Sequence, residues 1–233
     1  MSSEESGMIF PGLTRLVYDK IDYGLLLLAG APGVGKTILC KESVYKSLQE
    51  GDSIVYLTTE ETPEAIVSSM KKFGWDVTDY VNNDKLRIVD AFSGRGNMPA
   101  NSKFRIEDPE NLTNVSIMIE KAREGVSNVV FVLDSITRLI LGAGTEWGRK
   151  FMQTVACRLQ GARALGICVL DVGILDETFL NFLRFLFDGV IDMRVTEEGG
   201  QLRRLIRVYS LKMGRHDTSW HEFQITPKGI EIL

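Results

Sequence analysis

The stretch of this 233-residue chain with the most specific chemistry is a glycine-rich run that ends in lysine and threonine. Its sequence is Gly30-Ala31-Pro32-Gly33-Val34-Gly35-Lys36-Thr37, which fulfils the spacing GxxxxGK[ST]. Glycines let backbone N–H groups surround phosphate oxygens, the lysine reaches the β and γ phosphates, and the hydroxyl binds Mg²⁺. We therefore predict that this run binds ATP, with Lys36 also catalytic and Thr37 a ligand of Mg²⁺.

A carboxylate that could share this Mg²⁺ follows the apolar run at residues 129–133. That residue is Asp134, and ligands in parallel α/β sheets sit at the carboxyl ends of the strands. The alternative is that Asp134 only marks an ordinary strand end, because an apolar strand followed by aspartate is by itself a weakly specific pattern. Combined with the glycine-rich run, it predicts that Asp134 holds Mg²⁺ together with Thr37, directly or through water.

Paired glutamates, Glu60 and Glu61, follow a third apolar stretch and precede Pro63. Hydrolysis of ATP needs a group that orients or deprotonates the attacking water, and a glutamate at the end of a neighbouring strand can reach it. We therefore predict Glu60 and Glu61 as catalytic candidates. The alternative is that both only favour the start of the helix near Pro63.

The pattern of the whole chain predicts the sheet that would position these groups. Apolar runs of β composition alternate with helical patterns, which is typical of an α/β fold with a mostly parallel, twisted sheet flanked by helices. The predicted strands are residues 25–29, 53–58, 86–90, 129–133 and 166–171, and the predicted helices are residues 36–50, 63–73, 111–124 and 146–165.

Near the C-terminus the pattern predicts an antiparallel hairpin, residues 190–196 and 203–212, and then strands at 221–225 and 229–233. Arg203, Arg204 and Arg207 cluster there, with Arg203 and Arg207 on one strand face and Arg204 on the other. These arginines either keep a solvated sheet edge from aggregating or contact phosphates of single-stranded DNA or of a neighbouring subunit's nucleotide.

Two further segments carry expectations of their own. Residues 92–103 are rich in Gly, Asn and Ser and predict a long exposed loop, with Arg95 and Arg105 as further DNA-contact candidates. Residues 174–187 would be apolar nearly all round as a helix, so we expect a buried helix there.

Composition limits the class of protein. The net charge of −4 argues against a protein whose whole surface is basic and binds nucleic acid. It stays compatible with a local stripe of basic side chains. The three cysteines are far apart, which favours neither a disulfide framework nor a metal site. Because the start is polar and acidic and no long apolar run occurs, we expect a cytoplasmic protein without a membrane segment, with residues 1–6 as a disordered tail and 7–233 as one ATPase domain.

At these motifs the chain resembles the RecA superfamily, in its KaiC-like and archaeal RadA-like branch. The resemblance spans nearly the whole chain and is carried by Gly7-Met8-Ile9-Phe10-Pro11-Gly12-Leu13-Thr14-Arg15-Leu16, Thr59-Glu60-Glu61-Thr62-Pro63-Glu64, Asp188-Gly189-Val190-Ile191, Lys212-Met213-Gly214-Arg215-His216 and Phe223-Gln224-Ile225-Thr226. It implies a RecA-type P-loop fold and a head-to-tail homo-oligomer. In such an oligomer Lys212 and Arg215 are candidates to reach the nucleotide of the next subunit.

The chain also departs from this family. The strand at 166–171 ends in Asp171, where the family commonly has an uncharged polar residue that senses the γ-phosphate, and a carboxylate would repel a phosphate. Gly214 stands where the closing signature commonly has arginine, one residue before Arg215. The N-terminal DNA-binding domain and polymerisation motif of RadA-type recombinases are also missing from this sequence. These differences indicate a core-only paralogue.

Three functions are compatible with the sequence. The first is a RadA-like paralogue that hydrolyses ATP slowly, binds single-stranded DNA and assists recombination or repair, alone or with a recombinase partner. The second is a KaiC-like regulatory ATPase that acts through protein partners without DNA. The third, a small-molecule kinase, is disfavoured because Glu60 and Glu61 are placed to act on water.

Overall fold

The computed structural model describes residues 10, 13, 15–19, 21–96, 102–212 and 214–233, so the predicted tail at 1–6 lies outside the described residues. Its helices are α1 (Lys36–Gln49), α2 (Pro63–Lys72), α3 (Thr78–Asn82), α4 (Leu112–Arg123), α5 (Ile136–Ala143), α6 (Thr145–Gly161), α7 (Glu177–Leu186) and the short 3-10 helix η2 (Ser93–Gly96). Its strands are β1 (Gly24–Gly30), β2 (Ser53–Thr58), β3 (Leu86–Asp90), β4 (Phe104–Arg105), β5 (Val129–Asp134), β6 (Leu165–Asp171), β7 (Gly189–Glu198), β8 (Gln201–Leu211), β9 (His221–Thr226) and β10 (Gly229–Ile232).

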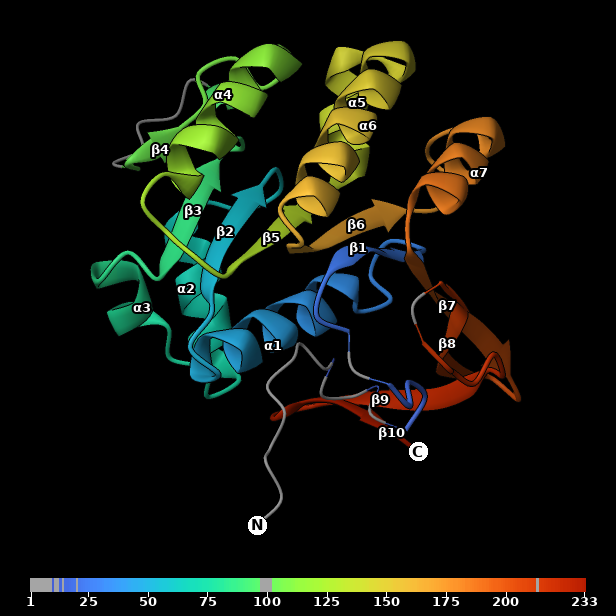
Figure 1. The fold of residues 1–233 in the computed structure, drawn as a ribbon. Coiled ribbons are helices and arrows are strands. Elements are labelled where there is room, and N and C mark those ends of the chain that lie inside the picture. Colours follow the sequence, from blue (N-terminus) through green and yellow to red (C-terminus); the bar gives the residue numbers. More distant parts are fainter. Residues whose placement is uncertain (1–9, 11–12, 14, 20, 97–101, 213) are drawn as a thin grey trace.

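All ten of these strands form one sheet in the order β10-β9-β8-β7-β1-β6-β5-β2-β3-β4. The pairs from β7 to β4 are parallel, whereas β7, β8, β9 and β10 pair antiparallel with one another. The predicted α/β fold with a mostly parallel sheet and a C-terminal antiparallel hairpin is therefore confirmed (Figure 1).

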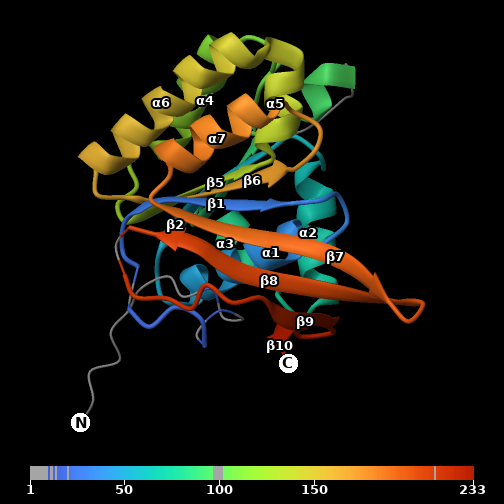
Figure 2. The same cartoon turned by 90° about the vertical axis from the view of Figure 1, so that its right-hand side faces the viewer.

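Helices cover both faces of the parallel half of the sheet, as Figure 2 shows. Side chains alternate along each strand, so that in β1 Leu26 and Leu28 join the core under α1 and α2. Leu25 and Leu27 join the opposite core, beneath α4, α5, α6 and α7. Burial of β1 on both faces explains its continuous apolar sequence.

Three local expectations need correction. The helix predicted to reach residue 165 ends at Gly161, because Arg163 turns the chain with φ of 48° before β6 begins. In the segment predicted as an exposed loop, Ser93 and Gly94 of η2 are buried, and residues 97–101 lie outside the described residues. The helix predicted as buried all round is amphipathic: Phe179 is buried, but Phe185 is 81% exposed because only one face of α7 packs on the sheet.

The C-terminal strands lie against the start of α1. A Cβ atom built on Gly35, whose φ is 119°, would lie 3.2 Å from Cδ1 of Ile225 in β9. The backbone N–H of Ile230 in β10 donates to Oε2 of Glu42 in α1 at 2.9 Å. Burial raises the pKa of Glu42, although this hydrogen bond acts in the opposite direction. The antiparallel end of the sheet is thus tied to the glycine-rich loop.

Candidate nucleotide-binding site

The glycine-rich loop joins the carboxyl end of β1 to the first turn of α1, as predicted. Gly33 and Gly35 have φ values of 76° and 119°, a conformation that side-chain-bearing residues rarely adopt. Lys36 curls back over the loop, and its Nζ donates to the carbonyl oxygens of Gly30 at 3.0 Å and Ala31 at 2.8 Å. This is a loop whose backbone can approach phosphate closely.

A pocket of about 520 Å³ opens beside this loop. Pro32, Gly33 and Gly35 form part of its wall, while Val34 is buried in the core below. Its polar side chains come from the carboxyl ends of strands far apart in sequence and from the helices that follow them: Lys36, Thr37, Glu60, Asp134, Thr137, Arg138 and Asp171. The structure therefore brings together most of the predicted catalytic and metal-binding residues.

Asp134 is buried at the end of β5 and accepts two hydrogen bonds. Its Oδ1 lies 3.3 Å from Oγ1 of Thr37, and its Oδ2 accepts from the hydroxyl of Tyr56 at 2.8 Å. Burial raises the pKa of Asp134 to about 6, while the hydrogen bond from Tyr56 lowers it. The carboxylate is thus mostly ionised at neutral pH, and protonation near pH 5 would weaken it as a metal ligand.

These oxygens fit Mg²⁺, which prefers hard oxygen ligands and usually takes only one or two of them from the protein. Thr37 and Asp134 supply such a pair next to the phosphate-binding loop. Within the described part of the chain, no group of three or more His, Cys, Asp or Glu residues could hold a metal by itself. The donor set therefore suits an ion whose remaining ligands are water and phosphate oxygens.

Tyr56 was missed by the sequence analysis. It is buried in β2, and burial together with the neighbouring Asp134 raises the pKa of its phenol. A tyrosine within a buried strand must find a partner for its hydroxyl, and this rule could have pointed to Asp134. The hydrogen bond from Tyr56 fixes the direction of the Asp134 carboxylate.

Glu60 faces the pocket and is 35% exposed. Its Oε1 accepts from Oγ of Ser135 at 2.9 Å and lies 3.5 Å from Nε of Arg138 on α5. Oγ1 of Thr59 accepts from the backbone N–H of Ser135 at 2.8 Å, which joins the ends of β2 and β5 beneath Glu60. This carboxylate is therefore held in place at the pocket, beside a cation that the sequence analysis missed.

Glu61 points elsewhere. Both of its carboxylate oxygens accept from Nζ of buried Lys41 on α1, at 2.8 and 3.0 Å, and Lys41 also donates to Ser69 on α2. The N-cap of α2 is Thr62, whose hydroxyl accepts from the N–H of Ala65, so neither glutamate belongs to the first turn of that helix. The structure separates the two glutamates: Glu60 lines the pocket, and Glu61 binds Lys41, the residue that joins α1 to α2.

Asp171 forms an ion pair with Lys36, with 2.8 Å between Oδ1 and Nζ. The backbone N–H of Asp171 donates to Oγ1 of Thr137 at 2.8 Å, which fixes the end of β6 beside the loop. From its place at the end of the strand we expected this carboxylate to repel a phosphate. In the structure it contacts the lysine that would bind that phosphate.

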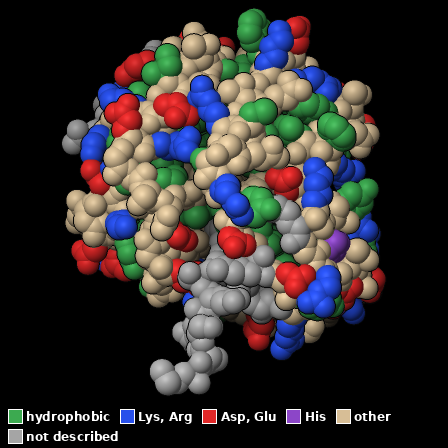
Figure 3. All heavy atoms as spheres, viewed as in Figure 1, with side chains coloured by type: hydrophobic (Ala, Val, Ile, Leu, Met, Phe, Trp, Pro, Cys, Tyr) green, Lys and Arg blue, Asp and Glu red, His purple; other side chains and the backbone are tan. Residues whose placement is uncertain are grey.

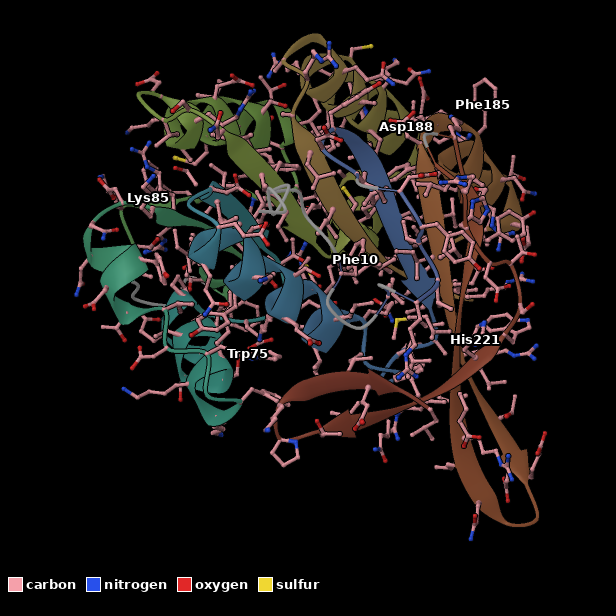
Figure 4. The ribbon with its side chains drawn as sticks, turned by 60° about the horizontal axis from the view of Figure 1, so that its bottom comes forward. Phe10, Trp75, Lys85, Phe185, Asp188 and His221 are labelled. Atoms are coloured by element: carbon pink, nitrogen blue, oxygen red, sulfur yellow. The ribbon has the colours of Figure 1, made fainter. Side chains whose placement is uncertain are left out.

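Lys212 and Arg215 lie away from this pocket. Nζ of Lys212 donates to the carbonyl of Phe185 at 3.1 Å and lies 3.8 Å from Asp188, and Figure 4 shows Phe185 and Asp188 at the same end of the molecule. Arg215 binds Asp19 through its backbone N–H and its guanidinium, which lowers the pKa of Asp19 to about 2. Neither cation lines the pocket of its own chain.

The predicted DNA-contact residues are placed on the hairpin as expected, with Arg203 and Arg207 opposite Thr196 and Asp192 on one face and Arg204 on the other. Carboxylates accompany two of them. Arg207 lies 3.0 Å from Asp192, and Arg203 lies 3.5 Å from Glu198 and 3.3 Å from Glu222. These ion pairs reduce the positive charge that the hairpin offers to a polyanion.

The other two DNA-contact candidates, Arg95 and Arg105, also form contacts within the chain. Arg95 donates to the carbonyls of Thr59 and Arg138, and Arg105 lies 3.0 Å from Glu107. Acidic and basic side chains are interspersed on the face drawn in Figure 3.

Among the described residues no helix has the length and hydropathy needed to cross a bilayer.

Comparison with known proteins settles the family. The family model described as ATPase: KaiC matches residues 11–233. The chain belongs to the KaiC ATPase family. This KaiC-like assignment confirms the predicted nucleotide-binding P-loop ATPase core.

Relatives of this KaiC-like chain include two proteins named UPF0273. One, from Thermotoga maritima, is 28% identical over 225 residues, covering 95% of this chain and 93% of the relative. The other, from Aeropyrum pernix, is 30% identical over 228 residues, covering 95% and 90%. A crystal structure of a KaiC-like protein from Pyrococcus horikoshii OT3 matches with a TM-score of 0.76 at 22% identity and covers 99% of both chains, which supports the fold.

Proposed function

We propose that this KaiC-like chain is a Mg²⁺-dependent ATPase that turns over slowly, and that its nucleotide state governs assembly with protein partners. The observation that carries the proposal is the convergence of Lys36, Asp134 and Glu60 on one pocket beside the glycine-rich loop. Each supplies a separate requirement of phosphoryl transfer to water: a cation for the phosphates, a metal ligand and a base.

The chemistry follows from these positions. Lys36 and the loop N–H groups would bind the phosphates, and Thr37 with Asp134 would hold Mg²⁺, which would supply positive charge to the phosphates. Glu60 orients a water and accepts its proton as the water oxygen bonds to the γ phosphorus. The bond from that phosphorus to the β–γ bridging oxygen breaks, giving ADP and phosphate. Ser135 keeps Glu60 at the pocket during this step.

Phosphate release from ATP tests this function. We expect Mg²⁺-dependent release by the intact chain, and loss of most of it in Lys36→Ala, because that variant lacks the cation that binds the β and γ phosphates. Arg163→Ala, a change of a cation that does not line this pocket, is the matched control. Unchanged release in Lys36→Ala would show that the glycine-rich loop is not the site of hydrolysis.

Assembly belongs to the same proposal. RecA-type domains complete their site with a cation from the next subunit, and Lys212 and Arg215 lie outside the pocket of their own chain. We therefore propose a head-to-tail homo-oligomer in which these two residues reach the neighbouring nucleotide.

Binding of single-stranded DNA is the second candidate, favoured by arginines of the hairpin that lie over aromatic rings of β8 and of the segment just before β9. The guanidinium of Arg194 lies 4.1 Å from the ring of Trp220, and that of Arg207 lies 4.5 Å from Trp220 and 5.1 Å from Tyr209. Arginines interleaved with aromatic rings suit phosphates and bases, although Asp192 already neutralises Arg207.

A titration of labelled single-stranded oligonucleotide, followed by anisotropy, separates the two candidates. If DNA is the partner, binding is expected at low salt, independent of sequence, and should fall steeply as salt rises because counterions are released. Arg194→Ala should weaken it, whereas Lys121→Ala on α4 should not. Absence of binding with and without ATP would remove the DNA function and leave the regulatory one.

A further inference from the structure

Asp171 forms an ion pair with the lysine that is predicted to bind phosphate. Nζ of Lys36 is surrounded by three oxygens within 3.0 Å: the carbonyls of Gly30 and Ala31, and Oδ1 of Asp171. An ammonium group has three hydrogens to donate, so these acceptors use all of them. The lysine is only 5% exposed and its partner 15%. A phosphate oxygen can therefore accept a hydrogen bond from Lys36 only if it displaces one of these three acceptors.

Charge in the pocket makes this exchange costly. Its described side chains include two cations, Lys36 and Arg138, and three carboxylates, Glu60, Asp134 and Asp171. The lining thus carries an excess of one negative charge when all are ionised. A polyphosphate brings further negative charge into the same space, where like charges repel more strongly than in bulk water because Lys36, Asp134 and Asp171 are largely buried.

We propose that Asp171 is a positioning and specificity-determining residue: it competes with phosphate for Lys36, so that this site takes ATP as its Mg²⁺ complex and excludes metal-free ATP. This deepens the proposed function and rests on it. Thr37 and Asp134 would hold a divalent cation whose charge would offset the carboxylates, and the phosphates could then displace Asp171 from Lys36. An uncharged polar residue at this place would remove the charged competitor and leave Lys36 with its two backbone acceptors, so that phosphate could bind it with or without the metal.

Calorimetric titration of the intact chain with ATP, in Mg²⁺ and in excess EDTA, tests this inference. The measured quantity is the ratio of the Kd for metal-free ATP to the Kd for Mg²⁺–ATP. We expect a large ratio in the wild type, and a ratio at least about tenfold smaller in Asp171→Asn, mainly because metal-free ATP binds more tightly once one like charge is removed. Asp171→Ser removes the same charge and should act alike.

Two controls make the result specific. Glu177→Gln removes one negative charge from an exposed position in the first turn of α7 and should leave the ratio unchanged. Asp171→Glu keeps the charge and should retain most of the ratio. If the wild type binds no Mg²⁺–ATP, the proposed function itself fails. If it does bind Mg²⁺–ATP but both neutral variants keep the wild-type ratio, the role of Asp171 is overturned.

Discussion

Changing Glu60 to glutamine is expected to slow ATP hydrolysis by about 10² to 10⁴, the usual contribution of a positioned general base. The amide keeps the size of the side chain and its contact with Ser135, but it cannot accept a proton from water. Glu60 contacts Ser135 and Arg138 rather than the phosphate-binding Lys36 or the metal ligand Thr37, so the Kd for Mg²⁺–ATP should stay within a few fold. Single-turnover phosphate release and a nucleotide titration measure the two quantities.

Glu61→Gln is the matched control, since it makes the same chemical change one residue away. Its expected effect is on folding: the change weakens the partner of buried Lys41 and should lower the free energy of unfolding by about 1–3 kcal/mol. Denaturant titration measures this free energy of unfolding directly. A loss of turnover in Glu61→Gln as large as that in Glu60→Gln would contradict the assignment of the base to Glu60.

Removing both Lys212 and Arg215 is expected to lower turnover by about 10³ or more, because a cation supplied by a neighbouring subunit stabilises charge on the transferring phosphoryl group. Lys212→Ala/Arg215→Ala should still bind Mg²⁺–ATP, since neither side chain lines its own pocket. Lys121→Ala, an exposed cation on α4, should keep wild-type turnover.

Mixing distinguishes action across an interface from a local effect. Lys36→Ala protein retains Lys212 and Arg215, and the double variant retains the glycine-rich loop, so a mixed oligomer contains some complete sites. Each protein alone should be nearly inactive, and the mixture should recover part of the turnover over a range of ratios. If mixed oligomers form without recovery, Lys212 and Arg215 serve only the contacts with Phe185 and Asp19 seen within one chain.

The sequence was sufficient for those parts of the fold and site that depend on spacing along one segment. The glycine-rich loop and its flanking elements lie where the pattern predicted them, and Asp134 lies beside Thr37 because both follow parallel strands whose carboxyl ends meet at one edge. The roles of these residues in binding and catalysis stay predictions.

Side-chain direction could not be predicted in the same way. Glu60 and Glu61 are adjacent in the chain, yet one turns to Ser135 at the carboxyl end of β5 and the other to Lys41 in α1. Arg138 was missed because α5 is too short for a clear helical period. The pairing of Lys36 with Asp171 arises from β1 and β6 lying side by side, a register that only the folded sheet fixes.

The contact of Ile225 with Gly35 gives the C-terminus an importance beyond sheet closure. Strands β9 and β10 support the glycine-rich loop, which is the proposed binding site of the polyphosphate. The hydrogen bond from Ile230 to Glu42 attaches these strands to α1. Fusions or truncations made within β9 or β10, although far from the glycine-rich loop in sequence, would therefore disturb the loop itself. For reporter tags and domain insertions, the turn at Gly199 and Gly200 is the safer place, because both glycines are exposed and nothing lies within 4 Å of a Cβ atom built on either of them.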